Sequence, residues 1–231
     1  MNQIFTTIQK LRKTNYQTLT TPWFILLLLL CNACSNAQNV NAGCSIWRRD
    51  VKTLQDISSS SVSALLNTSP KTRTVAAMNK ETLTIEGVPT QLTNGRQWEN
   101  VIRQPSEKEL ISVHAKVIEC GKEGNDHDYH IVLQDIQTNE VMVAEIPSPD
   151  CTDVTNPVLR KRYAALRDWF DANVQKPTSK VLPLPQPIIV TVIGVPFWDG
   201  KHPGEVHGAA ANFREIHPVL DFIAGGHHAI Q

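Results

Sequence analysis

Two short stretches place histidines and carboxylates at alternate positions. "DHDYH" contains Asp126, Asp128 and His130, and "REIH" contains Glu215 and His217. Alternate residues of a β-strand point to one face of the sheet, so "REIH" presents its polar groups together, and "DHDYH" does so if its strand begins early. Neutral imidazole nitrogen and carboxylate oxygen are ligands of divalent metal ions. A metal ion so bound would activate water for hydrolysis, with a spare carboxylate as general base.

A further carboxylate comes from the strand that follows "DHDYH". We expect Gln137–Glu140 to be a tight turn, with Leu133 facing Ala144 across the hairpin. Glu145 is then a diagonal neighbour of His130. The candidate catalytic residues are therefore Glu145 and Glu215, and the candidate ligands of a substrate or a divalent metal ion are Asp126, Asp128, His130, His202 and His217.

Two roles without catalysis fit the same residues. Histidines flanked by carboxylates commonly form a hydrogen-bonded network that ties two strands together, and such a face can also bind a ligand without reacting with it. The chain contains no H-E-x-x-H zinc motif, no G-x-S-x-G nucleophile elbow and no Cys-His cluster at zinc-finger spacing. Enzymatic and non-enzymatic functions both remain open at this point.

The N-terminus has the pattern of a targeting segment. Lys10, Arg12 and Lys13 precede the apolar run Pro22–Leu30, and small residues follow it. The run is about half as long as the roughly 20 residues that a spanning helix needs. We therefore expect residues 1–37 to be a signal peptide and tether, cleaved either near Cys34, which would be lipidated, or after Ala37. The protein would be in the periplasm or outer envelope as a lipoprotein, or be secreted.

Export leaves a mildly acidic chain. Of the 22 basic and 22 acidic residues, three basic residues and no acidic ones precede Cys34. Such a chain has no general electrostatic attraction to nucleic acid or to anionic membranes. The charge pattern therefore carries no strong nucleic-acid signature and points to another ligand or an envelope partner, with a lipid on Cys34 as the one expected membrane contact.

Three cysteines remain after the signal peptide, namely Cys44, Cys120 and Cys151. Two of them should pair in an oxidising compartment. We expect a Cys44–Cys151 disulfide because both lie in loop-like sequence, whereas Cys120 ends a strand pattern.

The pattern of elements favours a mainly β fold with one helix. Residues 38–106 read as an irregular N-terminal arm with a short serine-capped helix. In residues 107–224, three strand patterns precede a helix capped by Asn156 and opened by Pro157, and two more strands follow it, one at Pro187–Val195 and one at 213–223. This order is that of a five-stranded OB-like barrel, and an open α+β sheet is the alternative. Residues 225–231 read as a flexible tail.

Five motifs of the chain resemble a family of exported bacterial proteins of uncharacterised function. They are "RRDVKTLQD", "DHDYHIVLQD", "VMVAEIPSPDC", "VTVIGVPFWDGKH" and "FREIHPVLDF", and they span Trp47 to Phe222. They match the family patterns VKTL-D, D-x-D-Y-H-x-V, AEIP-x-x-x-C, V-x-G-V-x-F-W-D and E-[LI]-H-P-V. The resemblance implies a secreted or envelope OB-like module and no particular reaction.

Two functions of different classes follow. The first is an exported OB-like module that binds an oligomeric ligand or an envelope partner. The second is a metal-dependent hydrolase, nuclease-like by fold analogy only, with Asp128, His130, Glu145 and His217 as its site. The second requires the side chains of His130 and His217 to converge.

Overall fold

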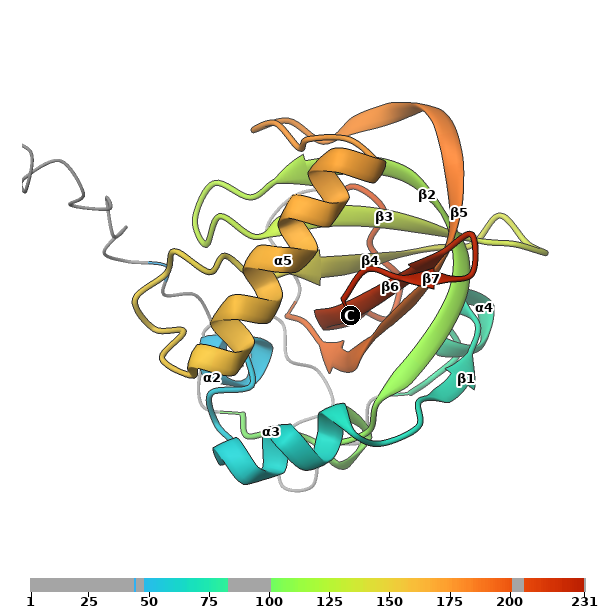
Figure 1. The fold of residues 1–231 in the computed structure, drawn as a ribbon. Helices are drawn as coiled ribbons and strands as arrows, with labels where there is room; N and C mark the ends of the chain where they lie inside the picture. Colours follow the sequence, from blue (N-terminus) through green and yellow to red (C-terminus); the bar gives the residue numbers. More distant parts are fainter. Residues whose placement is uncertain (1–43, 45–47, 83–100, 201–205, 231) are drawn as a thin grey trace, which may run out of the picture. The chain divides into compact units, whose positions relative to one another are not determined.

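The computed structural model describes residues 44, 48–82, 101–200 and 206–230 (Figure 1). The predicted signal peptide with Cys34, and the candidate ligand His202, lie outside the described residues. None of the helices found within these ranges combines the length and the apolar character needed to cross a membrane.

The described residues form one mixed sheet of seven strands. Five of them pair in the order β2–β3–β4–β6–β5, and β2 pairs with β5 as well, so that the five close into a ring. The pairing of β4 with β6 is parallel, and the other pairs of the ring are antiparallel. The strands are β1 (Lys71–Arg73), β2 (Ile111–Lys122), β3 (Tyr129–Asp135), β4 (Val141–Ile146), β5 (Leu182–Trp198), β6 (Arg214–Ala224) and β7 (His227–His228).

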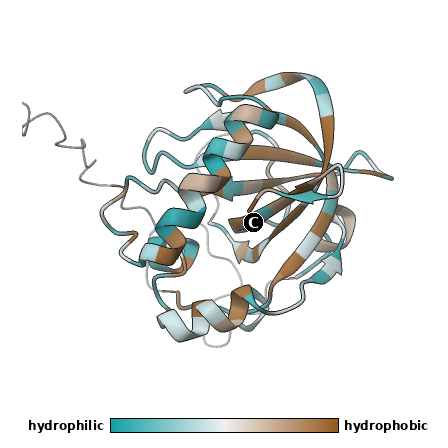
Figure 2. Ribbon diagram, viewed as in Figure 1, coloured by the Kyte–Doolittle hydropathy of each residue, from teal (hydrophilic) through white to brown (hydrophobic). Residues whose placement is uncertain are grey.

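The mainly β prediction is confirmed, and the ring explains how the strand patterns are buried. In β2, Ile111, Val113, Ala115 and Val117 are fully buried and alternate with more exposed residues, as their spacing predicts. β3 is buried almost throughout. The hydrophobic colouring of the ring strands in Figure 2 reflects this continuous core. The pairing of β2 with β5 closes the ring, which an open sheet would not do.

The predicted register of the β3–β4 hairpin is wrong by two residues. Ile131 pairs with Ala144, and His130 lies directly opposite Glu145 rather than diagonal to it. The cause is a longer turn, which is closed by the pairing of Asp135 with Glu140. The carboxylate of Asp135 stabilises this turn by accepting hydrogen bonds from the backbone N–H groups of Gln137 and Thr138. A shift of two keeps every side chain on its predicted face.

Helix α5 (Pro157–Asn173) lies between β4 and β5 in the chain and contacts β4 and β6 (Figure 1). Asn156 caps it, accepting from the N–H groups of Val158 and Leu159, as predicted. The stripe of Leu159, Tyr163, Leu166 and Phe170 is buried against the ring.

The N-terminal arm contains more structure than the single short helix expected from the sequence. That helix is present as α3 (Ser59–Leu66), with Ser58 as its cap. The arm also contains α2 (Arg49–Lys52), α4 (Val75–Met78), the 3-10 turn η2 (Pro105–Glu107) and β1, which pairs with β2. These segments are too short for their periodicity to be visible in the sequence.

Two further segments differ from the prediction. Phe197 and Trp198, which lie beyond the end of the strand predicted at Pro187–Val195, belong to β5 and are buried, with Trp198 stacked against the guanidinium of Arg214. Within the expected flexible tail, His227–His228 forms β7 against β6, and the His228 ring lies 2.6 Å from the Asp221 carboxylate. The tail is ordered there because a two-glycine turn, Gly225–Gly226, folds it back at positive φ.

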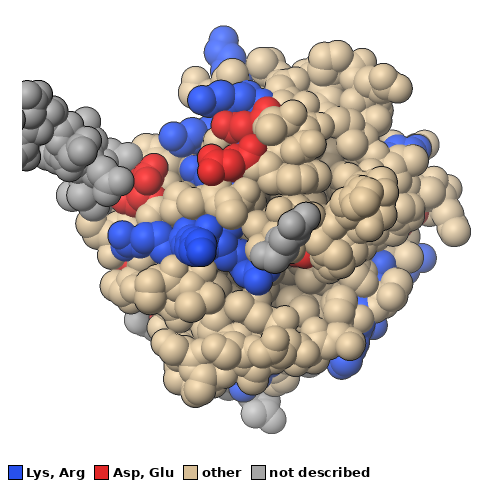
Figure 3. All heavy atoms as spheres, viewed as in Figure 1, with Lys and Arg blue, Asp and Glu red and all other residues tan. Residues whose placement is uncertain are grey.

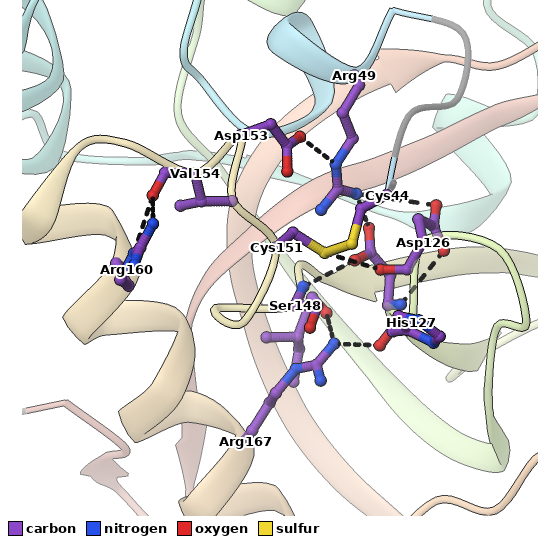
Figure 4. The surroundings of a disulfide bond; sticks show 12 residues. Cys44, Arg49, Asp126, His127, Ser148, Cys151, Asp153, Val154, Arg160 and Arg167 are labelled. Atoms are coloured by element: carbon purple, nitrogen blue, oxygen red, sulfur yellow. Dashed lines mark hydrogen bonds and ion pairs between the residues drawn. A yellow bond between two sulfur atoms is a disulfide. The ribbon is translucent and has the colours of Figure 1, made fainter. Parts of the chain in front are cut away.

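The predicted disulfide is confirmed. Cys44 and Cys151 are bonded across a sequence separation of 107 residues, and Cys120 is a buried free thiol. Figure 4 shows the disulfide beside Arg49, Asp126 and Asp153. It therefore attaches the start of the arm to the ring close to the charged groups described below.

Because the disulfide closes a loop of 107 residues, its removal should lower the free energy of unfolding by about 3–5 kcal/mol. The measurement is urea unfolding of the purified protein with and without reductant, alongside a Cys44→Ser/Cys151→Ser variant. The variant should match the reduced protein and be insensitive to reductant. An equal reductant effect in wild type and variant would show that the effect does not come from this bond.

Candidate functional site

Six predicted residues converge into one cluster, which we call the histidine–carboxylate cluster. All six are at least nine-tenths buried. They come from three neighbouring strands and the loop before β3. The members are Asp126, Asp128, His130, Glu145, Glu215 and His217.

Strand pairing brings the cluster together. β3 and β4 place His130 opposite Glu145. The parallel pairing of β4 with β6 then sets Glu215 beside Val143, and because alternate residues share a face, His217 lies on the same side as Glu145. Residues that are far apart in the chain thus meet because three strands are neighbours in the ring.

The carboxylate of Glu145 is the centre of the cluster. Its Oε1 lies 3.2 Å from Nδ1 of His130, and its Oε2 lies 3.0 Å from Nδ1 of His217. The two histidines therefore do converge, but on opposite oxygens of one carboxylate. Each half of the cluster has its own additional partners, and we call them the inner half, around His217, and the outer half, around His130.

The inner half is closed on every side. Nδ1 of His217 is also 3.2 Å from Glu215, and its Nε2 lies 3.2 Å from Asp128 at an angle that does not make a hydrogen bond. The ring of Phe197 packs against the imidazole edge-on. His217 and Asp128 are both inaccessible to solvent.

Two cations from α2 neutralise the inner half, and neither was among the residues predicted from the sequence. Nη1 of Arg49 lies 2.6 Å from Asp128, and Nζ of Lys52 lies 3.8 Å from Glu215 and 3.7 Å from Asp199. Both side chains are buried. Their motif, "RRDVKTLQD", was visible, but its position in an irregular arm hid the contact with the ring. A signal that could have found them is the presence of two basic residues three apart on one helical face.

The pKa values of the carboxyl groups in the cluster are shifted in opposite directions. Burial raises the pKa of Asp126 to about 7, and the charges of Asp128 and Glu145 add to this effect. Burial would also raise the pKa of Glu145, but the charges of Lys52 and His217 hold it well below its usual value. The pKa of Asp128 is likewise lowered against the effect of burial, by His217 and Arg49. Burial raises the pKa of Glu215.

Both histidines gain proton affinity from these carboxylates. Burial alone would lower the pKa of His217, yet the charge of Glu145 and the surrounding carboxylates raise it well above its ordinary value. The pKa of His130 is raised to about 9, because the hydrogen bond and charge of Glu145 outweigh the effect of burial. The inner half is therefore an internally neutralised network of imidazolium, guanidinium, ammonium and carboxylate groups.

The outer half reaches two loops at the surface. Nδ1 of His130 is 3.3 Å from Glu123, whose side chain is 44% exposed, and Nε2 of His130 is 2.8 Å from the carbonyl oxygen of His207. The side chain of His207 lies 3.4 Å from Glu119. Glu123 and His207 were not singled out in the sequence as members of this site, because they lie in loops without periodicity.

The basic stretch of α5 does not belong to the site. Figure 3 shows Lys, Arg, Asp and Glu side chains gathered over this helix. Arg160 and Lys161 are exposed, as expected for a solvent face. Arg167 of the same helix is buried: it donates to the carbonyl groups of His127 and Ile146 and lies over the ring of Tyr129.

The opposite pKa shifts of Asp126 and Asp128 predict opposite effects of two neighbouring substitutions. Asp126 contributes most to stability below its unfolded-state pKa, and this contribution is lost as the pH rises toward about 7. The free energy of unfolding of Asp126→Asn, relative to that of wild type, should therefore increase by about 2–3 kcal/mol between pH 5 and pH 8. The stability from Asp128 is present above its unfolded-state pKa and lost in acid, so Asp128→Asn should be destabilising at pH 8 and less so near pH 4.

Urea unfolding at pH 4, 5 and 8 measures both effects in the same protein. The two variants serve as mutual controls, because they remove the same charge two positions apart. A loss of stability at pH 8 for Asp126→Asn as large as that for Asp128→Asn would contradict the assignment.

In comparisons with protein-family models, with curated proteins and with solved structures, nothing matches this chain.

Proposed function

We propose that this chain is an exported OB-like module that binds an oligosaccharide on the β3–β4 side of the ring, between the loops 123–128 and 206–213. The order of the ring supports the OB-like description. A helix lies between its third and fourth strands, and its fifth strand lies between the third and the fourth. OB folds bind oligosaccharides and oligonucleotides on the second and third strands, flanked by the loops after the first and the fourth strand.

The observation that carries the proposal is the meeting of these two loops at His130. One loop brings Glu123 to Nδ1 of its ring, and the other brings the carbonyl of His207 to Nε2. Gly208 follows at φ 73°, and a Cβ there would lie 2.4 Å from the Val132 side chain, so this loop packs closely on β3. The second strand of the ring thus has polar groups from both loops at the place where OB folds bind ligands.

The chemistry of this face favours a sugar over a nucleic acid. Glu119, Glu123 and Glu145 are carboxylates, which repel phosphates but accept hydrogen bonds from sugar hydroxyl groups. Phe197 and Trp198, the aromatic residues at the end of β5, are buried. Stacking on exposed aromatic side chains and a positive groove are what single-stranded nucleic acid requires.

The hydrolase alternative is less well supported by this geometry. It needs His130 and His217 on one metal ion, whereas they face opposite oxygens of Glu145. Arg49 and Lys52 already neutralise the inner half.

If the face binds an oligosaccharide, substitutions at its exposed rim should weaken binding without unfolding the protein. The side chain of His207 is 65% exposed and that of Glu119 is 30% exposed. We expect His207→Ala and Glu119→Gln each to weaken binding about fivefold, the effect of one lost hydrogen bond of about 1 kcal/mol. The measurement is calorimetric titration of the protein with soluble fragments of cell-envelope polysaccharide.

His114→Ala is the matched control, because His114 is an exposed residue of β2 whose ring contacts Thr191 of β5. It should bind like wild type. Binding of single-stranded oligonucleotides but not of polysaccharide fragments, or sugar binding that both rim substitutions leave unchanged, would refute the proposal.

We also propose export with a lipid anchor on Cys34. The buried Cys44–Cys151 disulfide supports an oxidising compartment. A radioactive fatty acid supplied to the producing cells should label the wild-type protein and not a Cys34→Ser variant. Release of an unlabelled wild-type protein beginning at Gln38 would instead indicate ordinary cleavage after Ala37.

A further inference from the structure

In the outer half of the cluster, one histidine nitrogen and two carboxylate oxygens lie close together. Nδ1 of His130 lies 3.2 Å from Oε1 of Glu145 and 3.3 Å from Oε1 of Glu123. Ligand atoms of all three residues lie within 4.8 Å of one another. A proton on Nδ1 lets the imidazolium pair with both carboxylates, and a divalent cation is the other positive centre that these three atoms can share.

The contact of Nε2 decides which ring nitrogen of His130 carries a hydrogen. A carbonyl oxygen only accepts hydrogen bonds, so the 2.8 Å contact with His207 requires Nε2 of His130 to carry a hydrogen. In the neutral ring, the lone pair is then on Nδ1 and points at the two carboxylates. Metal-binding histidines are usually oriented in this way, with the other ring nitrogen donating to a carbonyl or a carboxylate.

The spacing of the three atoms is compatible with a shared metal ion. A charged N–H···O contact is about 2.7–2.9 Å long, and Arg49 and Asp128 in the same cluster are 2.6 Å apart. The His130 contacts are longer, at 3.2 and 3.3 Å. Ligand atoms that are each about 2.1 Å from a tetrahedral ion are about 3.4 Å from one another.

The inner half does not offer such a place. Asp128 is paired with Arg49, and Lys52 lies near Glu215, so an added cation would meet two fixed positive charges. His217 and Asp128 are also closed to solvent, whereas Glu123 is 44% exposed and gives the outer half contact with water. Glu145 links the halves: its second oxygen contacts His217, which orients the carboxylate toward His130.

We propose that Glu123, His130 and Glu145 bind one divalent transition-metal ion of the zinc or manganese type. One imidazole and two carboxylates suit these ions, while calcium prefers oxygen ligands alone. Three protein ligands leave one position of a tetrahedral ion for another ligand. The role we assign to that position, holding a hydroxyl group of the bound sugar, rests on the proposed function, whereas the metal site itself does not.

Calorimetric titration of the metal-stripped protein with zinc chloride and manganese chloride tests the site. We expect one ion per chain, and a dissociation constant raised about tenfold or more by Glu123→Gln. Glu123 is the residue to change because its side chain is 44% exposed, and we expect the melting temperature of the variant without metal to equal that of wild type. Glu119→Gln, which alters a carboxylate facing His207 instead, should bind metal like wild type.

Two results would overturn the site: no saturable binding of either metal, or binding that Glu123→Gln leaves unchanged. A His227→Ala/His228→Ala variant guards against adventitious binding by β7, and loss of binding in that variant would also overturn it. Repeating the polysaccharide titration in EDTA separates the two proposals. Sugar binding that survives without any metal binding would refute the metal site and leave the proposed function standing, while metal binding without sugar binding would do the reverse.

Discussion

The structure depends on two buried cations of the N-terminal arm, Arg49 and Lys52, which lie next to carboxylates of the ring strands and of the loop before β3. Asp128, Glu145 and Glu215 are almost completely removed from water, and a buried carboxylate without a partner costs several kcal/mol. Arg49 and Lys52 supply the compensating charge. The Cys44–Cys151 disulfide and the hydrogen bond from Tyr163 of α5 to the backbone of Thr53 hold α2 in this position. The arm is therefore a required component of the core.

Local patterns predicted the ring strands well, and contacts between distant segments were the part that could not be predicted. The alternation in β2 and the capped, striped helix α5 follow from neighbouring residues, so their sequence is sufficient. The hairpin register depended on one side chain, Asp135, whose hydrogen bonds to the turn backbone lengthen it by two residues. Six of the seven predicted site residues lie within the described chain and share one cluster. Strand alternation placed four of them correctly, whereas β3 begins only at Tyr129, so Asp126 and Asp128 reach the cluster from a loop and not from an early start of the strand. The cluster has further members that come from an irregular arm and from loops, where the sequence has no periodicity from which to predict their positions. They are Arg49, Lys52, Glu123 and His207.

The two histidines that looked equivalent in the sequence have different environments. His217 is enclosed by Glu145, Glu215, Asp128 and the ring of Phe197, and its surroundings are those of a residue that stabilises the fold. His130 has one ring nitrogen fixed by a loop carbonyl and the other directed at a half-exposed glutamate. Glu145, between them, is fixed by the first and available to the second. A buried network of this kind can hold a surface site rigid, which is what a binding face needs.

The inner half of the cluster also joins an early and a late element of the described residues. Its cations come from α2, the first described helix, and His217 and Glu215 come from β6, near the C-terminus. The charges of α2 therefore lack some of their partners until β6 has been synthesised and has folded. During synthesis, the buried charges are compensated only after β6 has been added to the chain. A boundary drawn at residue 107 separates two sequence patterns, but the chain segments on either side of it share one buried network of charges.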